Sequence, residues 1–287
     1  MNDDAAVVAR KTWRTLEPIH GLIYFVPEAA EHYSAIGIVG RAGYFASRAA
    51  AMGAVTAEVV IATFFNFNPK LVRAAIPAAW ETASIDKILE ARLEAADAAL
   101  RRALGDLVDG PEMARAADLA RAAAEAAVDE IEGRPLFAGH ARLPWPDAPH
   151  LVLWHAQTLL REYRGDGHIA ALTAGGLSGI EALVLHAATG EVSASVLKAS
   201  RAWSDDEWEA AVESVRARGW LADGDDLQLS PSGASHRQSI EDTTDRLAAR
   251  AYRGLGEDGC AELRALARPF SKAIVSSGTF GFAAADS

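Results

Sequence analysis

The sequence predicts a mainly α protein, in which an N-terminal helical bundle is followed by a C-terminal winged-helix domain. Three observations predict it: helical periodicity before residue 132, a cluster of prolines between 133 and 150, and a helix–strand–turn–strand–helix order between 203 and 250. The expected division is a helical bundle at 1–135, a proline-rich linker at 136–148, and the winged-helix domain with C-terminal helices at 149–287. A chain of 287 residues, 50% of them hydrophobic, is long enough for two such domains.

Two segments of the N-terminal half carry apolar residues at every third or fourth position, which is the period of a helix. The first runs from Ile85 to Leu107 and the second from Met113 to Ile131, with Gly110–Pro111 between them. The many alanines in both segments favour helix formation. We therefore expect two long antiparallel helices that pack closely along an alanine-rich seam.

The proline cluster interrupts this pattern, because proline does not continue a helix. After it, the sequence predicts a helix over Pro149–Arg164 that is terminated by Gly165–Asp166–Gly167. Short helices are then expected at 168–174, 178–188 and 192–202.

The segment from Trp203 to Arg250 has the element order of the wing module found in many bacterial regulators. Ser204 is a helix N-cap residue and Gly219 ends that helix. Two short strands, at 220–223 and 227–229, flank the turn Gly224–Asp225–Asp226, and Ser230–Pro231 opens the next helix. The fold of this segment argues for DNA binding.

The charges of the same segment argue against it. Residues 200–232 contain eight acidic residues but only three basic ones, Arg201, Arg216 and Arg218, and the whole chain has a formal net charge of −11. Duplex binding gains affinity when Lys and Arg neutralise phosphates. The helix face expected to point outward carries Glu209, Ala210, Glu213 and Ala217, so we predict weak duplex binding.

Three runs, at 41–48, 62–69 and 153–168, complete a family resemblance together with the wing. The chain resembles a family of actinobacterial proteins described as helix-turn-helix or MarR-like and largely without an assigned function. The resemblance implies a helical N-terminal half fused to a winged helix, and it carries over no catalytic residue. The MarR comparison covers only about 150–250, and its usual wing arginine is absent from the tip Gly224–Asp225–Asp226.

His155, Thr158 and Glu162 fall on one face of the helix predicted after the prolines, at spacings of three and four. Glu162 could orient His155 or accept its proton, and Trp154 adjoins them in sequence. The pair His155 and Glu162 is therefore a candidate for ligand binding or catalysis. The alternative is a capped helix end, in which nearby arginines meet the negative end of the helix dipole.

A second candidate site is the stripe Arg41, Tyr44, Phe45 and Arg48, where two guanidinium groups could hold a carboxylate or a phosphate. The alternative is a pair of salt bridges. Ten aromatic residues also gather before the prolines, and Phe64 beside Asn66 would suit a pocket for a flat, mostly apolar ligand. The alternative for these aromatics is the hydrophobic core alone.

Other classes of site are not supported. The histidines form no His-x-x-x-His pair and Cys260 is the single cysteine, so neither a metal site nor a disulfide is expected. No cofactor is identified. The acidic start of the chain and the lack of a long apolar run indicate a cytoplasmic protein without a membrane partner.

The sequence favours recognition of a small, largely apolar organic molecule in a pocket between the two halves. Three functions stay open: a ligand-responsive transcription regulator with a weak or degenerate DNA-binding surface, a ligand-sequestering protein without DNA binding, and an enzyme that uses His155 and Glu162. Nucleic acid is a weakly supported partner, and a homodimer stays open.

Overall fold

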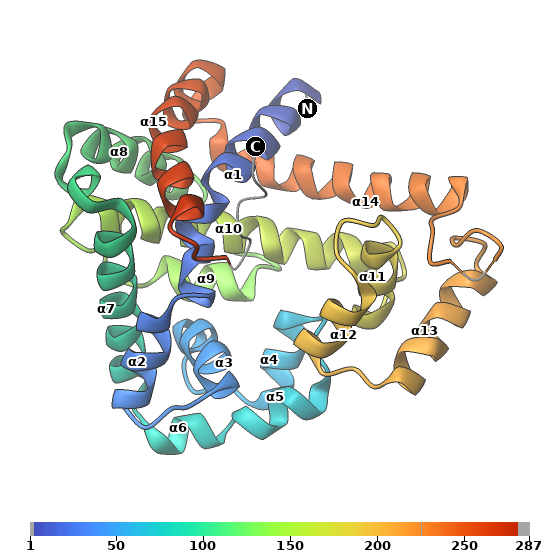
Figure 1. The fold of residues 1–287 in the computed structure, drawn as a ribbon. Coiled ribbons are helices and arrows are strands. Elements are labelled where there is room, and N and C mark those ends of the chain that lie inside the picture. Colours follow the sequence, from blue (N-terminus) through green and yellow to red (C-terminus); the bar gives the residue numbers. More distant parts are fainter. Residues whose placement is uncertain (1–2, 225, 281–287) are drawn as a thin grey trace.

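The structure, a computed structural model, describes residues 3–224 and 226–280 and is built almost entirely of helices (Figure 1). The α-helices are α1 (Asp3–Gly21), α2 (Pro27–Ala35), α3 (Arg41–Ala49), α4 (Ala57–Phe64), α5 (Pro69–Ala75), α6 (Ala78–Thr82), α7 (Ile85–Leu104), α8 (Pro111–Glu125), α9 (Pro135–Ala141), α10 (Pro149–Ala174), α11 (Gly179–Ala187), α12 (Ala194–Arg201), α13 (Asp205–Ala217), α14 (Pro231–Ala248) and α15 (Gly256–Ser276). Short 3-10 helices lie at Leu22–Tyr24, Ala50–Met52, Gly105–Asp109 and Ala249–Tyr252. The predicted mainly α class is confirmed.

Two hydrophobic cores organise these helices. The first core joins α1–α9, the first part of α10 and the C-terminal helix α15. The second core joins the end of α10, α11–α13 and part of α14. Helix α10 belongs to both and runs through the middle of the molecule (Figure 1).

The two cores do not divide the chain at the predicted boundary. Leu136 and Phe137, inside the predicted linker, are buried in the first core at the start of α9. Helix α15 packs on α1, far from the second core. The domain division at 136–148 stays a prediction.

Helix α10 is longer than the sequence predicts. It continues from Pro149 through Gly165 and Gly167 to Ala174, so the prediction that these glycines end it is wrong. Close packing accounts for Gly167: a Cβ there would lie 3.0 Å from Nη1 of Arg134 and 3.4 Å from Cβ of Leu247. The absence of a side chain at Gly167 thus lets Arg134 and Leu247 lie close to the helix surface.

Helices α7 and α8 exist close to their expected places, but the prediction that they pack together as an antiparallel pair is wrong. The 3-10 segment Gly105–Asp109 turns the chain between them, and Gly105 has a φ of 54°. Helix α8 packs mainly on α10 and α15, and α7 packs mainly on α2. The small alanines of α8 therefore serve close contact with α10.

The C-terminal segment follows the expected order. Ser204 caps α13 and forms a capping box with Glu207. The predicted strands are reduced to one antiparallel bridge between Leu221 and Leu229, which is the β structure found within the described residues. Asp225, in the predicted wing tip, lies outside the described residues. A short hairpin thus connects α13 to α14.

Candidate functional site

A cavity of about 390 Å³, here called the central cavity, lies where the first core meets the second. Side chains from α1, α3, α4 and the following loop, α9, α10, α11, α12 and α14 form its walls. Aromatic rings and charged groups are both present: Trp13, Tyr44, Phe64, Phe65 and Phe67 are the rings, and Glu17, Arg48, Arg161, Glu162, Arg164, Asp166, Arg201, Arg237 and Glu241 are the charged residues.

A buried ion pair forms one wall. Nη2 of Arg48 donates to both carboxylate oxygens of Glu162, at 3.0 and 3.1 Å, and Nη1 donates to the hydroxyl of Tyr44 at 2.7 Å. Arg161 donates to Glu162 at 3.2 Å and to Glu17 at 3.0 Å. Burial raises the pKa of Glu162, but the charges of Arg48 and Arg161 outweigh burial and lower it to about 2. Glu162 is therefore a poor proton acceptor at neutral pH.

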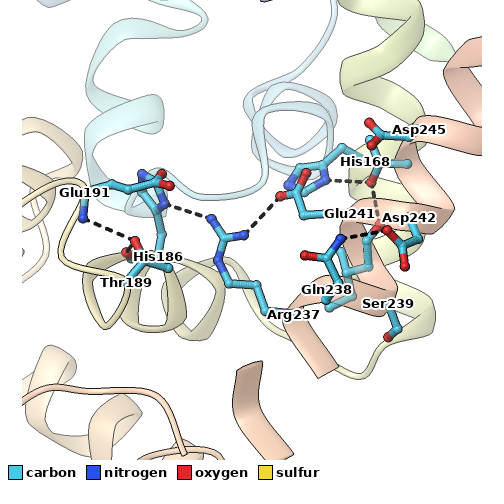
Figure 2. Close-up of polar contacts among 12 residues, drawn as sticks. His168, His186, Thr189, Glu191, Arg237, Gln238, Ser239, Glu241, Asp242 and Asp245 are labelled. Atoms are coloured by element: carbon cyan, nitrogen blue, oxygen red, sulfur yellow. Dashed lines mark hydrogen bonds and ion pairs between the residues drawn. The ribbon is translucent and has the colours of Figure 1, made fainter. Parts of the chain in front are cut away.

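Another part of the wall contains a chain of contacts between α11 and α14 (Figure 2). Arg237 lies between Nδ1 of His186 and Oε1 of Glu241, at 3.3 Å from each. From α10, His168 meets the hydroxyl of Thr244 at 2.9 Å. These contacts hold α14 against the cavity wall. The charged groups of Arg237 and Glu241 are thereby paired with other groups of the protein.

Arg201, at the end of α12, is a cation in the cavity wall that has no carboxylate within ion-pair distance among the described residues. Its guanidinium carbon lies 4.8 Å from the ring centroid of Phe67, and its buried Nε has no hydrogen-bond partner there. Burial lowers the pKa of Arg201, and the charges of Arg48 and Arg41 lower it further. An anion at this point would offset both effects.

The loop after α4 supplies a second unpartnered group to the same cavity. The buried Oδ1 of Asn66 lacks a partner within the described part of the chain. Phe65, just before it, has a φ of 60°, which is uncommon for a bulky residue and persists only where the surroundings enforce it. Its carbonyl faces Gly179 of α11 so closely that a Cβ at Gly179 would lie 2.0 Å from the oxygen.

This loop also holds the start of α13. Nε1 of Trp203 donates to the carbonyl of Asn66 at 2.9 Å, and the backbone N–H of Asn68 donates to the carbonyl of Arg201 at 3.0 Å. Nδ2 of Asn68 donates to Glu207, in the first turn of α13, at 3.0 Å. Asn66 and Arg201 thus border the central cavity while adjoining residues fix the position of α13.

The structure brings five of the predicted site residues to the central cavity: Tyr44, Arg48, Phe64, Asn66 and Glu162. The other five lie elsewhere. Arg41 donates to the carbonyl of Ala199 at 3.0 Å, and Phe45 is buried against Phe67 with their ring centroids 5.0 Å apart.

Trp154, His155 and Thr158 are buried in the first core, away from the cavity walls. Oγ1 of Thr158 meets Nδ1 of His20 at 3.0 Å, and no hydrogen bond joins His155 to Glu162 within the described residues. Burial, followed by the charge of Arg92, lowers the pKa of His155 to about 4. The binding and catalytic roles of these residues stay predictions.

Arg201 is the main cavity residue that the sequence did not single out. In sequence it is one of the few bases of an acidic segment. Its place in the cavity depends on how α12 docks against the loop after α4, and no local pattern encodes that docking. Arg237 and His186 were missed because their places depend in the same way on how α14 and α11 dock.

The described residues contain no group of three or more His, Cys, Asp and Glu side chains arranged to hold a metal ion. No single helix in the described residues is long and apolar enough to span a membrane. Two sharply bent pairs of helices, Arg41–Met52 with α4 and α10 with α11, have that length and apolar character only when the two members of each pair are counted together.

Comparison with known proteins gives one match. No curated protein and no solved structure matches this chain significantly. The sequence model of a helix-turn-helix family matches residues 9–281, which cover both cores. The chain therefore belongs to this helix-turn-helix family.

Proposed function

We propose that the protein binds a small organic anion with an aromatic or otherwise apolar body in the central cavity, and that this ligand controls the helix-turn-helix segment. The observation that carries the proposal is the double position of Arg201 and Asn66. Both border the cavity, and both adjoin the contacts that fix the start of α13. A ligand that binds one position of α13 better than another shifts the balance between them.

The chemistry of the ligand follows from the cavity walls. Arg201 offers an unmatched positive charge beside the ring of Phe67. A carboxylate would pair with the planar guanidinium group, and an apolar body would lie against the aromatic walls. The ligand first expected from the sequence, small and largely apolar, thus gains an anionic end.

The segment from α11 to α14 also supports a winged-helix reading of MarR type, with α13 as the recognition helix and the hairpin after it as the wing. Glu209 and Glu213 of α13 are exposed, as are Ala210 and Ala217. In regulators of this class that helix enters the major groove. Because acidic groups repel phosphates, we propose that duplex binding is weak.

A sequestering protein without DNA binding is the second candidate, and the basic residues of the segment favour it. Arg201 lies in the cavity wall, Arg216 donates to the carbonyl of Gly224 at 3.3 Å, and Arg218 donates to the carbonyl of Gly176 at 2.7 Å. Arg216 and Arg218 are thus engaged by backbone carbonyls, and Arg201 faces the cavity. The enzyme alternative receives less support, since Glu162 is held in ion pairs and His155 lies outside the cavity walls.

Thermal unfolding with a panel of probes tests the ligand proposal. Benzoate, salicylate and indole-3-acetate should raise the melting temperature, whereas the matching amides should not. Arg201→Gln should lose the response, and Arg216→Gln, in the same segment but outside the cavity, should keep it. A response that is equal in both variants, or no response to any carboxylate, would refute the anionic ligand.

Selection from a pool of random duplexes separates the two candidates. At physiological salt we expect no duplex bound at nanomolar affinity. A specific nanomolar site that depends on α13 would overturn weak binding and favour the transcription regulator.

A further inference from the structure

Four polar side chains lie deep in the first core and outside the walls of the central cavity. They are Arg92 of α7, His140 of α9, and Trp154 and His155 of α10, and we call them the inner polar cluster. Their exposed fractions are 3%, 1%, 3% and 5%. Within the described residues, Nη1 and Nη2 of Arg92, Nε2 of His140, Nε1 of Trp154 and Nε2 of His155 have no hydrogen-bond partner.

These side chains are close enough to act on one another. The guanidinium carbon of Arg92 lies 4.9 Å from the ring centroid of Trp154. Burial lowers the pKa of His140 to about 3 and that of His155 to about 4, and the charge of Arg92 contributes to both shifts. The two imidazoles are therefore neutral at neutral pH, and Arg92 carries the positive charge of the cluster.

The side chains next to the cluster do not complete it. His20 stacks on Trp154 with ring centroids 6.1 Å apart, but its two ring nitrogens already meet Thr158 and Tyr24, at 3.0 and 2.7 Å. Trp145 packs edge-on against His155 with centroids 4.8 Å apart. These two side chains pack against the cluster without supplying a hydrogen-bond acceptor or a negative charge to it. The carboxylate whose charge acts on His140 is that of Glu162, and Arg48 and Arg161 already pair with it.

The unpartnered atoms share one chemistry. Arginine Nη and tryptophan Nε1 are donors only, and a neutral imidazole can donate from Nε2 in one of its tautomers. An unpaired buried ion and unpaired buried donors are both costly. The complementary group is a small acceptor that carries one negative charge.

We propose that the inner polar cluster binds a small monovalent anion, either the carboxylate of a small organic acid or a halide, held by Arg92 and the N–H groups of Trp154, His140 and His155. The site is separate from the central cavity and does not depend on the function proposed for it. Its role is to complete the polar interior of the first core.

Thermal unfolding in sodium formate, chloride and bromide, against sodium sulfate at equal ionic strength, tests the site. Wild type should show a saturable rise of about 2–4 °C. Arg92→Met should lose that rise and should melt higher than wild type in sulfate, because it removes an unpaired buried charge. Arg101→Met, a change of an exposed arginine on the same helix, should keep the rise and corrects for general salt effects.

The pattern across the salts identifies the source of the anion. A rise with formate alone indicates a carboxylate site, and a rise with chloride and bromide alone indicates a halide site. An equal rise in Arg92→Met and wild type, or no rise in wild type, overturns the proposal. Arg201→Gln should retain the response to these small ions, so failure of this site and failure of the central cavity are distinguishable.

A second measurement does not require the variant to fold. Crystals of wild type grown in bromide should show an anomalous scattering peak beside the guanidinium of Arg92, and formate soaked into the same crystals should remove it. Bromide at other positions only, with none at Arg92, would contradict a halide site; if formate likewise gave no density there, the proposal would be overturned.

Discussion

The two cores differ in where they keep their polar groups. The first core buries titratable side chains, including His20, Arg48, Arg92, His155 and Glu162. The second core is a small apolar cluster with one buried carboxylate beside it, that of Glu181, which pairs with Arg218. Its helix α13 turns most of its acids to solvent. Burying polar groups is costly unless they are paired, whereas surface charge affects mainly association. We therefore expect ligand binding to depend on the first core and on its border with the second core.

Removal of the buried ion pair should give the largest effect. Arg48→Ala leaves Glu162 buried and short of its main partner, so we expect a loss of about 3–5 kcal/mol in the free energy of unfolding. Urea denaturation followed by circular dichroism measures it. Arg73→Ala, which breaks an exposed pair with Glu58, should cost less than about 1 kcal/mol. Similar losses in the two variants would remove the contrast between buried and surface charge.

Acidification should weaken the first core next. The pKa of His155 is about 4 in the folded protein, below its value of about 6.5 when unfolded, so the unfolded state takes up the proton first. Stability should therefore fall as the pH drops from about 6.5 to 4, by about 3 kcal/mol from His155 alone. Urea denaturation across this range should show a shallower fall for His155→Phe. An identical pH dependence in that variant would contradict the buried neutral imidazole.

The contact between the cores offers a steric test. Gly179→Ala would place a Cβ 2.0 Å from the carbonyl oxygen of Phe65, and such overpacking costs about 1–3 kcal/mol. The melting temperature should drop and proteolysis near 65 and 179 should speed up. The control is Gly254→Ala, whose Cβ would meet Ala126 at an ordinary 3.8 Å. If Gly179→Ala behaves like that control, the cores are not held together at this point.

The sequence predicted the local features of the fold better than its packing. The limits of α13 follow from Ser204 and Glu207, because a capping box is local chemistry. The predicted end of α10 was wrong, because Gly167 is there for close packing against Arg134 and Leu247, which are distant in sequence.

The same limit applies to the site. Helical spacing placed Glu162 and Arg48 as candidates, and the structure joins them directly. Helical spacing could not show that Glu162 pairs with Arg48 in preference to His155, or that Arg201 borders the same cavity. Those relations arise when α3, α10 and α12 converge, and helical spacing alone does not encode that convergence.

The smallest effect on stability should come from the surface of the second core. Glu209→Lys with Glu213→Lys should change the free energy of unfolding by no more than about 0.5 kcal/mol, because both positions are exposed. Duplex affinity at low salt should rise, since two repulsive groups become attractive. Glu257→Lys with Asp258→Lys on α15 makes the same change of net charge and should raise it less. An equal rise in both, by fluorescence anisotropy, would mean that α13 has no special place in duplex contact.

Native mass spectrometry tests most directly whether the central cavity takes an organic anion at Arg201. Wild type and Arg201→Gln would be mixed with equal amounts of benzoate, salicylate, indole-3-acetate and their amides. We expect wild type to retain one carboxylate molecule per chain and no amide, and Arg201→Gln to retain neither. Retention of amides as readily as carboxylates, or the same bound mass in both proteins, would contradict the claim.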